Sequence, residues 1–412
     1  MIYQLKGSGF WLDEAVDNLL SYLESLGTAN ETIVCAAGMT PSAPIHFGIL
    51  REIAISSFVA DELLRRNKKA KLVYYWDDYD HFCKIPYFTK KEDVAEHIGK
   101  TLREVPDFNG LYKSYGEHYM HEFEKCLHKC GFFPEYNYQS KMYKSGNYTS
   151  RIRQALNQRK EIFDIIGKSA GLSKEEINKR REDYYPLEVY CSKCGKDSTF
   201  TTGWQPEKDT ITYTCKECGY QGSYILGSNF HGKLVWKVNW ALRWSDDKVA
   251  YESSGENQLT DTGSYSVSSK VAETIFGGKV PFSLLYRFIG IRGIAKVSRA
   301  QGEKTLATRF TGVLEPCIVR WLLLKTAPNK PFSVDIEDGI FRIYHEWDCF
   351  VQKVQNGEAT DIEKRIYELA TDGVEITRFP IPFRTIITAL GICGDNKRAA
   401  GFLCVRRICA DL

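Results

Sequence analysis

The stretch from Thr32 to Leu50 constrains the fold of this chain more than any other part of the sequence. It opens with a short run of β-branched and small apolar residues, which predicts a buried parallel strand. Gly38 and the Thr-Pro-Ser-Ala-Pro cluster that follows predict a turn. After the turn, apolar residues recur at helical spacing, namely Leu50, Ile53, Ala54, Phe58, Val59 and Leu63. A strand, a tight turn and a helix in this order place free backbone N–H groups beside the turn, which favours phosphate binding.

Two interpretations of this turn compete. The simpler one is an ordinary strand-to-helix connection that contains a buried histidine. Thr40 and Ser42, however, line the same turn, and the small residue Gly48 stands two places after His46. A nucleotide could therefore approach the backbone closely while His46 donates hydrogen bonds to its phosphates. We expect a nucleotide site here.

The order Pro41-Ser42-x-x-x-His46-x-Gly48 resembles the His-Ile-Gly-His signature of class I aminoacyl-tRNA synthetases. More narrowly, it is similar to the Pro-Ser-Gly-x-Ile-His-Ile-Gly-Asn form in class I lysyl-tRNA synthetases. The chain departs from that form at three positions: Ala43 replaces Gly, Phe47 replaces Ile and Ile49 replaces Asn. The resemblance implies that ATP binds at this turn.

Composition sets outer limits on the class of protein. The chain has 412 residues, enough for two or three domains, and its net charge of +3 excludes a bulk polycation. No run of about 18 apolar residues predicts a membrane span. The opening residues lack the basic-then-apolar pattern of a secretory signal. Thirteen scattered cysteines, an odd number, indicate a reducing compartment, so we expect a cytoplasmic protein with no membrane partner.

A second strand, Lys71 to Trp76, ends in the acidic sequence Asp77-Asp78-Tyr79-Asp80. Acidic residues just beyond a parallel strand lie where open α/β sheets bind ligands, although each alone could be a helix-capping aspartate. The stretch is similar to the Asp-Asp-x-Asp-x-x-x-Lys segment of the family, with Lys84 in the matching place. Because an ammonium substrate needs a carboxylate, Asp78 and Asp80 are candidates for the amino-acid pocket.

Residues 91–166 look mostly helical, with a long helix expected over Ser114 to Cys130. Basic side chains in this insert could contact an RNA backbone, but a solvated helix face explains them equally well and we favour it. These side chains are Lys141, Lys144, Arg151, Arg153 and Arg159.

Two cysteine pairs predict a zinc ribbon. Cys191-x2-Cys194 is followed twenty residues later by Cys215-x2-Cys218, and each pair can supply two thiolates to one tetrahedral Zn²⁺. A glycine after the second cysteine of each pair provides the sharp turn that such a knuckle needs. Four thiolates leave no open coordination position, so the metal should be structural. The alternative, four free thiols, fits this spacing poorly.

The run Val235 to Val238 predicts a return to the sheet, followed by an aromatic cluster that includes Trp240. The Gly-punctuated stretch Gly255 to Tyr265 predicts a ligand-facing loop and a helix start. Both regions resemble the family, in which the loop carries Asp and His where Asn257 and Gln258 stand here. The resemblance implies that Gly263 and Ser264 lie near the nucleoside. The pocket for the amino acid would be formed by Gly38, Trp240, Gln258 and Tyr286.

The replacement of an acidic residue and an imidazole by two amides predicts an amino-acid specificity that is relaxed or shifted away from lysine. An amide forms hydrogen bonds but supplies no negative charge to an ammonium group. The alternative is that both residues lie outside the pocket and only orient Tyr286 or Trp240.

The Gly-flanked basic stretch from Gly290 to Gly302 predicts a loop that closes over a triphosphate. It resembles the Lys-Met-Ser-Ser-Ser-Lys signature of class I synthetases, aligned by Lys296 and Ser298. Gln301 replaces the closing lysine of that signature, and Arg299 is a possible substitute. With His46, Lys296 is the expected catalytic residue; Thr40, Ser42, Gly48, Ser298 and Arg299 are the expected nucleotide-binding residues around them.

These motifs predict an α/β protein with a Rossmann-like parallel sheet, a helical insert, a zinc ribbon and an all-helical C-terminal part that is short for the family. The expected segments are 1–90 and 231–305 for the two halves of the nucleotide-binding domain, 91–190 for the insert, 191–230 for the ribbon and 306–412 for the C-terminal part.

The first functional hypothesis is an enzyme similar to class I lysyl-tRNA synthetases. It would use ATP, Mg²⁺ and structural Zn²⁺ to attach lysine or an analogue to tRNA. A second hypothesis is a paralogue that activates an amino acid for a biosynthetic or modification pathway. A third is an inactive RNA-binding or regulatory protein that keeps the fold.

Overall fold

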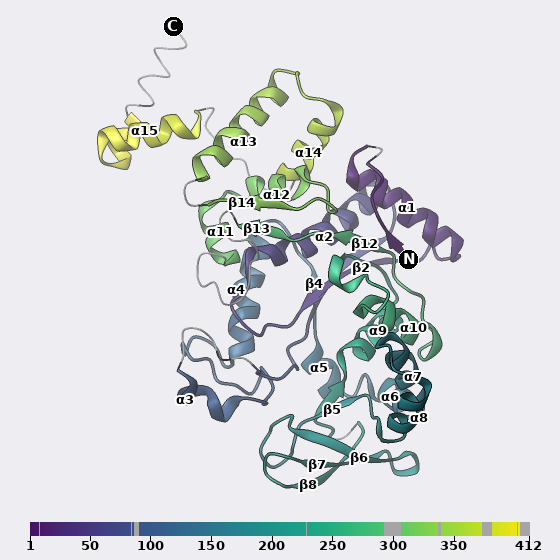
Figure 1. Cartoon of the computed structure of the whole chain (residues 1–412). Coiled ribbons are helices and arrows are strands. Elements are labelled where there is room, and N and C mark those ends of the chain that lie inside the picture. The colour runs from purple at the N-terminus through teal and green to yellow at the C-terminus, as the bar shows by residue number, and fades with distance from the viewer. Residues whose placement is uncertain are drawn as a thin grey trace.

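A computed structural model describes residues 1–7, 9–83, 85, 90–227, 229–291, 306–336, 339–372, 381–401 and 403. Its centre is a parallel sheet in the order β10-β2-β3-β4, with residues Val249–Glu252, Ile33–Met39, Ala70–Trp76 and Glu135–Tyr138 (Figure 1). A smaller parallel sheet has the order β1-β12-β11, with residues Ile2–Tyr3, Ser283–Tyr286 and Ser254–Gly255. A parallel bridge between Tyr251 and Phe282 joins the two sheets into one layer.

Strands of this layer are buried on both faces, which explains their continuous apolar sequences. In β2, Ile33, Cys35 and Ala37 face one hydrophobic core, whereas Val34 and Ala36 face the other. The alternation follows from the two-residue period of a strand. The strand predicted at the start of the Thr32–Leu50 stretch and the strand predicted at 71–76 are confirmed.

The first core is covered by long helices from both ends of the chain. Here α1 and α2, the latter with the predicted apolar periodicity, pack beside α4 and three helices of the C-terminal part. The bounds are α1 Trp11–Ser25, α2 Leu50–Arg65, α4 Tyr115–Lys129, α12 Pro316–Lys325, α13 Ile340–Gln355 and α14 Asp361–Thr371. The helix predicted over 114–130 is therefore confirmed, and residues 316–370 share their core with the sheet.

The second core lies on the other face and contains helices of the insert together with α9 and α10. Their bounds are α5 Gln139–Lys144, α6 Thr149–Asn157, α7 Arg159–Ser169, α8 Lys174–Arg180, α9 Trp236–Asp246 and α10 Ser264–Thr274. The strand predicted at 235–238 is wrong, because α9 begins at Trp236. A short apolar run does not distinguish a strand from a helix. The repeat of tryptophan at 236, 240 and 244 is the helical signal, since residues four apart share one helix face.

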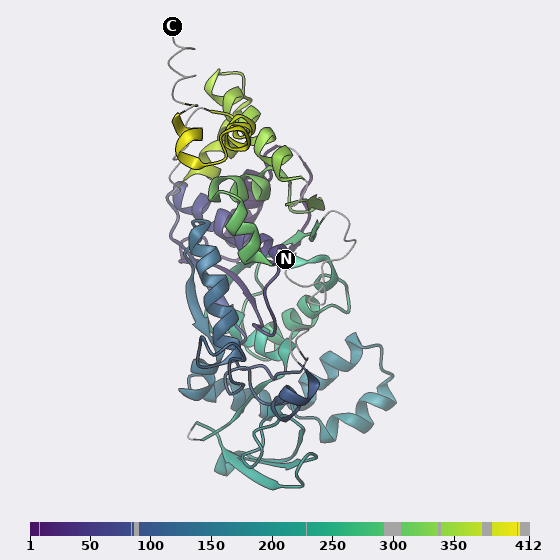
Figure 2. The ribbon, with the colours of Figure 1, turned by 90° about the vertical axis from the view of Figure 1, so that its left-hand side faces the viewer.

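The ribbon lies at one end of the molecule and the C-terminal helices at the other, with the sheet between them (Figures 1 and 2). The ribbon is an antiparallel sheet in the order β6-β7-β8. The two-stranded antiparallel ladder of β5 and β9 forms the base of the ribbon. These strands are β5 Leu187–Val189, β6 Thr199–Gln205, β7 Thr210–Cys215, β8 Gln221–Ile225 and β9 Gly232–Leu234.

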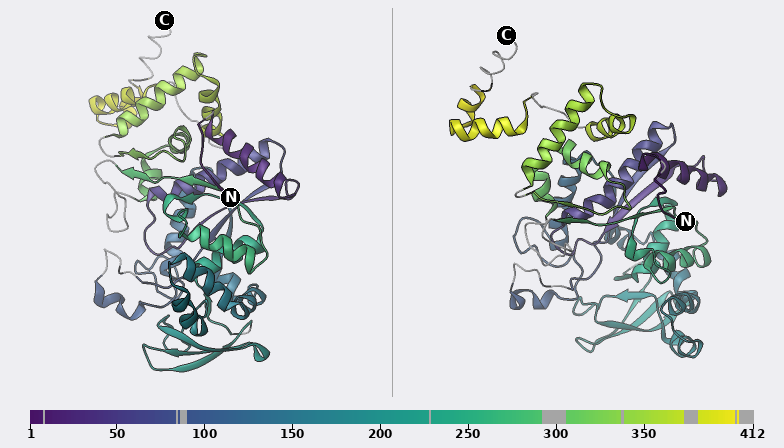
Figure 3. Two further views of the ribbon diagram at one scale, coloured as in Figure 1. Left: turned by 45° about the vertical axis from the view of Figure 1, so that its right-hand side comes forward. Right: turned by 45° about the horizontal axis from the view of Figure 1, so that its top comes forward.

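Helices dominate the described residues of the C-terminal part, but the prediction that this part is all-helical does not hold, because a short strand lies among them. That strand, β14 (Phe332–Val334), pairs in parallel with β13 (Ile289–Ile291). Helix α15 (Phe383–Cys393) projects from the body and stacks Phe383 on Tyr344 at 3.9 Å between ring centroids (Figure 3). Two further short helices are α3 (Lys91–Val94) and α11 (Ala307–Val313). Across the described residues, no helix combines the length and the apolar character that a membrane crossing requires.

Arg320 of α12 joins the C-terminal helices to the rest of the first core through hydrogen bonds. Its guanidinium donates two hydrogen bonds to the Leu369 carbonyl, at 2.8 and 3.0 Å, and further bonds to the carbonyls of Cys130 and Gly131. The side chain is buried between the rings of Phe58 and Phe132. One cation therefore satisfies carbonyl groups at the ends of α4 and α14.

We expect Arg320→Met to lower the free energy of unfolding by about 2 to 4 kcal/mol, because methionine fills the space but leaves buried carbonyls unsatisfied. Urea unfolding measures the change. The matched control is Arg342→Met, which removes an arginine that is 60% exposed and should change stability by less than about 0.5 kcal/mol. Equal effects of the two substitutions would contradict the anchoring role of Arg320.

Candidate functional site

The signature turn lies at the carboxyl edge of the parallel layer. The chain builds β2, β3 and β4 outward in one direction and then returns to place β10 on the other side of β2. The crevice between β2 and β10 is therefore the topological switch point, where open α/β sheets bind ligands. Residues 40–46 follow β2 there, and a 3₁₀ turn at Phe47–Ile49 leads into α2, whose N-terminus faces the crevice.

Glycine at position 48 leaves room for the ring of His46. A Cβ atom on Gly48 would lie 3.1 Å from His46 Nδ1 and 3.2 Å from Cε1, which is tighter than most Cβ contacts and would require the ring to shift by a few tenths of an ångström. The same Cβ would lie 3.6 Å from the Ile289 carbonyl oxygen, and Leu306 forms an antiparallel bridge with His46. The chain therefore leaves this turn at β13 and returns to it at Leu306.

Lys296, Ser298 and Arg299 lie outside the described residues, as do Lys84 and Gln301. The anchor points of residues 292–305 are described, however, and both lie beside the His46 turn.

The presence of Phe47 where the family's motif has Ile has a structural reason. Its ring stacks on that of Phe310 in α11, with 3.8 Å between centroids and 11° between planes. The aromatic pair joins the turn to the helix that follows residues 292–305, and both rings are buried.

The acidic residues after β3 form buried ion pairs with cations from distant parts of the chain. Asp77 accepts a hydrogen bond of 3.0 Å from Arg243 of α9. Asp80 pairs with Lys233 of β9 through Oδ1 and accepts a 2.6 Å hydrogen bond from the Thr40 hydroxyl at Oδ2. Thr40 thus directs its hydroxyl hydrogen to Asp80.

The partners of Asp78 differ from those of Asp77 and Asp80. It is 0% exposed and accepts hydrogen bonds from the backbone N–H and the hydroxyl of Ser140, at 2.8 and 2.6 Å. Arg103 completes its surroundings at 2.9 Å. Burial raises the pKa of Asp78, and the Ser140 hydrogen bonds and the Arg103 charge oppose that rise. Its oxygens are engaged in joining the insert to the sheet, so this placement does not favour a contact with substrate.

Sequence reasoning did not single out Glu52. It lies in the first turn of α2, four residues after Gly48 of the preceding 3₁₀ turn. Its carboxylate accepts a 2.6 Å hydrogen bond from Tyr286 of β12 and lies 3.5 Å from the backbone nitrogen of Gly38. Burial raises the pKa of Glu52 to about 7, although the Tyr286 hydroxyl opposes the rise.

Gly38 itself lies where β2 and β3 approach closely. A Cβ atom there would lie 2.6 Å from the Tyr75 carbonyl oxygen, so only glycine fits.

Glu252 at the end of β10 is a second carboxyl group that the sequence did not single out. Trp240 and Trp244 both donate their indole N–H to it, at 2.9 and 2.5 Å. Burial raises its pKa, and the nearby Arg243 acts in the opposite direction. This hydrogen bond holds Trp240 beside the end of β10, and its ring stacks on that of the half-buried Trp236 with 5.0 Å between centroids.

The carboxyl edge holds more acidic groups than basic ones. Four carboxyl groups interact electrostatically with one another here, and two buried cations accompany them. Arg243 and Lys233 pair with aspartates, whereas Glu52 and Glu252 form no ion pair with any described residue. A cationic ligand would supply the missing positive charge.

The loop between β11 and α10 is shaped by its own hydrogen bonds. Gln258 accepts a 3.0 Å bond from the backbone N–H of Gly255, and Asn257 is exposed. Gly263 is the N-cap residue of α10, and a Cβ atom on it would lie 2.3 Å from the Gln258 carbonyl oxygen. Ser264 is the first residue of that helix and is half-buried. This arrangement favours the alternative in which Gln258 lies outside the amino-acid pocket and orients neighbouring residues.

Most basic residues of the insert have intramolecular partners. Arg151 pairs with Asp246, Arg153 with Asp209 through two 2.7 Å bonds, and Arg159 donates to carbonyls of residues 181–184. The exposed Lys141 and Lys144 lie over the rings of Tyr138 and Tyr79.

The four cysteines converge as the spacing predicted. The Sγ atoms of Cys191 and Cys218 lie 3.7 Å apart, as do those of Cys194 and Cys215, and all four lie within 4.8 Å of one another. Tetrahedral Zn²⁺ with bonds of about 2.3 Å places its sulfurs about 3.8 Å apart. The donor set therefore fits zinc. Among the described residues, no other group of three or more potential metal ligands occurs.

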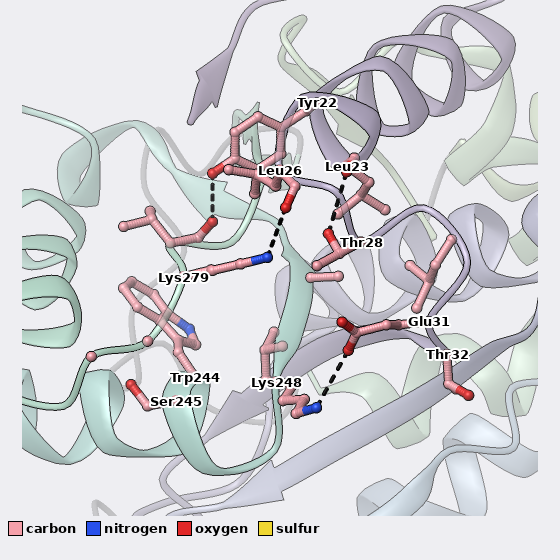
Figure 4. A pocket seen from close by; sticks show the side chains of 16 residues that line it. Tyr22, Leu23, Leu26, Thr28, Glu31, Thr32, Trp244, Ser245, Lys248 and Lys279 are labelled. Carbon is pink, nitrogen blue, oxygen red and sulfur yellow. Dashed lines mark hydrogen bonds and ion pairs between the residues drawn. The ribbon is translucent and has the colours of Figure 1, made fainter.

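A cavity of about 250 Å³ lies on the opposite edge of the layer (Figure 4). It is lined by the end of α1 and by the amino ends of β2 and β10, and its rim carries two lysines. Lys279 donates to the Leu26 carbonyl at 2.8 Å, and Lys248 pairs loosely with Glu31 at 3.4 Å. Because ligands of such sheets bind at the carboxyl edge, this cavity is separate from the signature turn.

A parallel layer with a His-x-Gly turn at its switch point defines a nucleotide-binding enzyme of the class I aminoacyl-tRNA synthetase type. The family model described as tRNA synthetases class I (K) matches residues 9–372. The chain belongs to this family, the class I lysyl-tRNA synthetases, and is an aminoacyl-tRNA synthetase-type ligase.

Curated relatives agree with this placement. A lysine–tRNA ligase of Streptomyces coelicolor is 30% identical over 95% of this chain and 73% of its own length. The corresponding enzyme of Thermococcus kodakarensis is 34% identical over 87% of this chain and 68% of its own. Among solved structures, a glutamate tRNA ligase from Elizabethkingia meningosepticum has a TM-score of 0.40 at 14% identity, covering 87% and 83% of the two chains.

Proposed function

We propose that this chain activates lysine with ATP and transfers it to tRNA. The observation that carries the proposal is the surplus of two carboxyl groups, Glu52 and Glu252, beside the signature turn. Lysine brings an α-ammonium and a side-chain ammonium, and both groups are protonated at neutral pH. These two carboxyl groups fit that charge better than Asp78, whose oxygens Ser140 and Arg103 occupy.

In the proposed first step, a carboxylate oxygen of lysine attacks the α-phosphorus of ATP and pyrophosphate leaves. His46 and the N-terminus of α2 would donate to phosphate oxygens, with Lys296, Ser298 and Arg299 closing from residues 292–305. Thr40, Ser42 and Gly48 would shape the turn, and Gly263 and Ser264 would lie near the nucleoside. The protein's main contribution is position and preorganised positive charge. Mg²⁺ would be held chiefly by the phosphates, since it commonly binds through substrate phosphates.

In the second step, a hydroxyl at the tRNA terminus would attack the carbonyl carbon of the adenylate, and AMP would leave. Lysine-dependent exchange between ATP and pyrophosphate tests the first step, and charging of purified tRNA with lysine tests the second. Lysine-dependent exchange without charging would indicate another acceptor. Exchange with a different amino acid would contradict the assignment of lysine and support the shift expected from Asn257 and Gln258.

His46→Ala or Lys296→Ala should each lower the exchange rate on the order of 10²- to 10³-fold, because each removes a donor to oxygens whose charge changes during attack. The change should fall on kcat more than on the KM for ATP. His128→Ala is the matched control, since His128 lies at the exposed end of α4 and contacts Tyr136. Parent rates in both site variants would contradict the site assignment.

Lysine binding should tighten as the pH rises from 6 to 8. Because the pKa of Glu52 is about 7, its side chain is mainly protonated at pH 6 and mainly anionic at pH 8, whereas lysine keeps both ammonium groups. Glu52→Gln should weaken lysine binding about tenfold to hundredfold at pH 8 and flatten the pH dependence. Calorimetric titration with lysine measures both effects.

The control for Glu52→Gln is Asp61→Asn on the same helix, about 13 Å further along its axis. Burial also raises the pKa of Asp61, so this variant separates contact with lysine from a general effect of a buried carboxyl group. A pH dependence that persists in Glu52→Gln would contradict the assigned contact.

We also infer that Cys191, Cys194, Cys215 and Cys218 hold one structural Zn²⁺. Metal analysis should find one zinc per chain, and Cys215→Ser should lose both zinc and folded protein, because binding and folding of such a site are coupled. Cys349→Ser removes an exposed cysteine outside the ribbon and should change neither quantity. A purified, folded chain without zinc under non-chelating conditions would contradict the inference.

A further inference from the structure

The loop after β3 is held from the ribbon side by a series of side chains. The Tyr190 hydroxyl donates to the Tyr79 carbonyl at 2.6 Å, and Asp197 pairs with His81 at 3.2 Å. Lys233 pairs with Asp80, the residue between them. The ribbon and its base therefore contact three successive residues, 79 to 81, of a loop that borders the signature turn.

Lys233 is the central contact of this series. It is 5% exposed and lies between two carboxylates, Asp80 and Glu188, with the latter at 3.3 Å. Glu188 and Lys233 stand directly opposite one another in the β5–β9 ladder, so the backbone of the ribbon base sets where the ammonium points. A buried ammonium is costly unless it is paired, and these carboxylates provide that pairing.

Asp80 connects Lys233 to the signature turn. One carboxylate oxygen takes the ammonium, and the other accepts the Thr40 hydrogen bond of 2.6 Å. Thr40 directly follows β2 and opens the turn that leads to His46. The ion pair therefore limits the positions that the Asp80 side chain can adopt. Through the hydrogen bond, Asp80 in turn limits the position of Thr40 at the start of the turn.

We propose that Lys233 is a positioning residue for the nucleotide turn: it holds Asp80 so that Asp80 fixes Thr40 at the start of that turn. The inference rests on the proposed function, since the turn it positions is the one assigned to ATP. It also gives the ribbon a second role, because the insert returns to the sheet through the strand that carries Lys233. A lysine that only stabilised the ribbon would have no such link to Thr40.

The charge of Asp80 responds to this arrangement. Burial alone would raise its pKa, but the Lys233 ammonium and the Thr40 hydroxyl outweigh that effect and lower the pKa below its ordinary value. The other charged or titratable groups facing this cluster are Asp77, His81, Glu188, Tyr190 and, through Asp77, Arg243. Removal of Lys233 should therefore raise the pKa of Asp80. In a plot of kcat against pH, the fall in kcat on the acid side should then occur closer to neutral pH.

A double-mutant cycle tests the proposal. Lys233→Met and Thr40→Val should each lower kcat for lysine-dependent exchange by about tenfold or more, and the double variant should fall no further than the worse single variant. Lys233→Arg, which keeps the charge, should recover part of the loss. Hydrogen exchange of the peptide spanning residues 39–48 should be faster in Lys233→Met and Thr40→Val than in the parent, whether or not the chain is active.

Arg153→Met is the matched control, since it removes an ion pair that also reaches the ribbon, at Asp209, but has no link to Asp80. It should leave the kcat profile and the 39–48 peptide unchanged. Should Lys233→Met fail to fold, the cycle is completed with Lys233→Arg, whose altered geometry also perturbs Asp80.

The outcomes separate the two claims. A parent chain without lysine-dependent exchange would overturn the proposed function, while the hydrogen-exchange measurement would still test the coupling. Fully additive losses in the cycle, with an unchanged fall in kcat on the acid side and equal hydrogen exchange in Lys233→Met and Arg153→Met, would overturn the positioning role.

Discussion

The site depends on two buried cations that reach the carboxyl edge of the sheet from other parts of the chain. Arg243 comes from α9 and pairs with Asp77, while its guanidinium lies over the rings of Tyr75 and Trp236. Lys233 comes from the base of the ribbon and pairs with Asp80. Without them, the aspartates after β3 would be buried without compensation, which would cost several kcal/mol for each charge. These cations form their ion pairs with the aspartates, so neither Glu52 nor Glu252 has an ion-pair partner among the described residues.

The parallel layer brings these groups together. A sheet that is covered on both faces offers ligands only its edges, and the switch point between β2 and β10 opens the carboxyl edge. Glu252 ends one of these strands, Thr40 follows the other, and Glu52 lies on the helix that the turn begins. The insert and ribbon leave the layer after β4 and return before β10, so they pass directly beside this edge.

Local features were predictable from the sequence because each depends on neighbours along the chain. The strand at 33–38, the turn at 40–46 and the ribbon knuckles follow from apolar runs, turn residues and cysteine spacing. The error at 235–238 has the same origin, since four residues do not distinguish a two-residue period from a helical one. The helix was visible only over the longer repeat of tryptophans.

The sequence by itself determined the family, the signature turn and the cysteine set, because motif order and spacing are properties of the linear chain. Only the tertiary structure decided which acidic residues face the site. Asp78 and Asp80 are two positions apart, yet one bonds to Ser140 of the insert and the other to Lys233, 153 residues away. The fold alone brings such partners together, since the direction of each buried side chain is set by the distant group that compensates its charge.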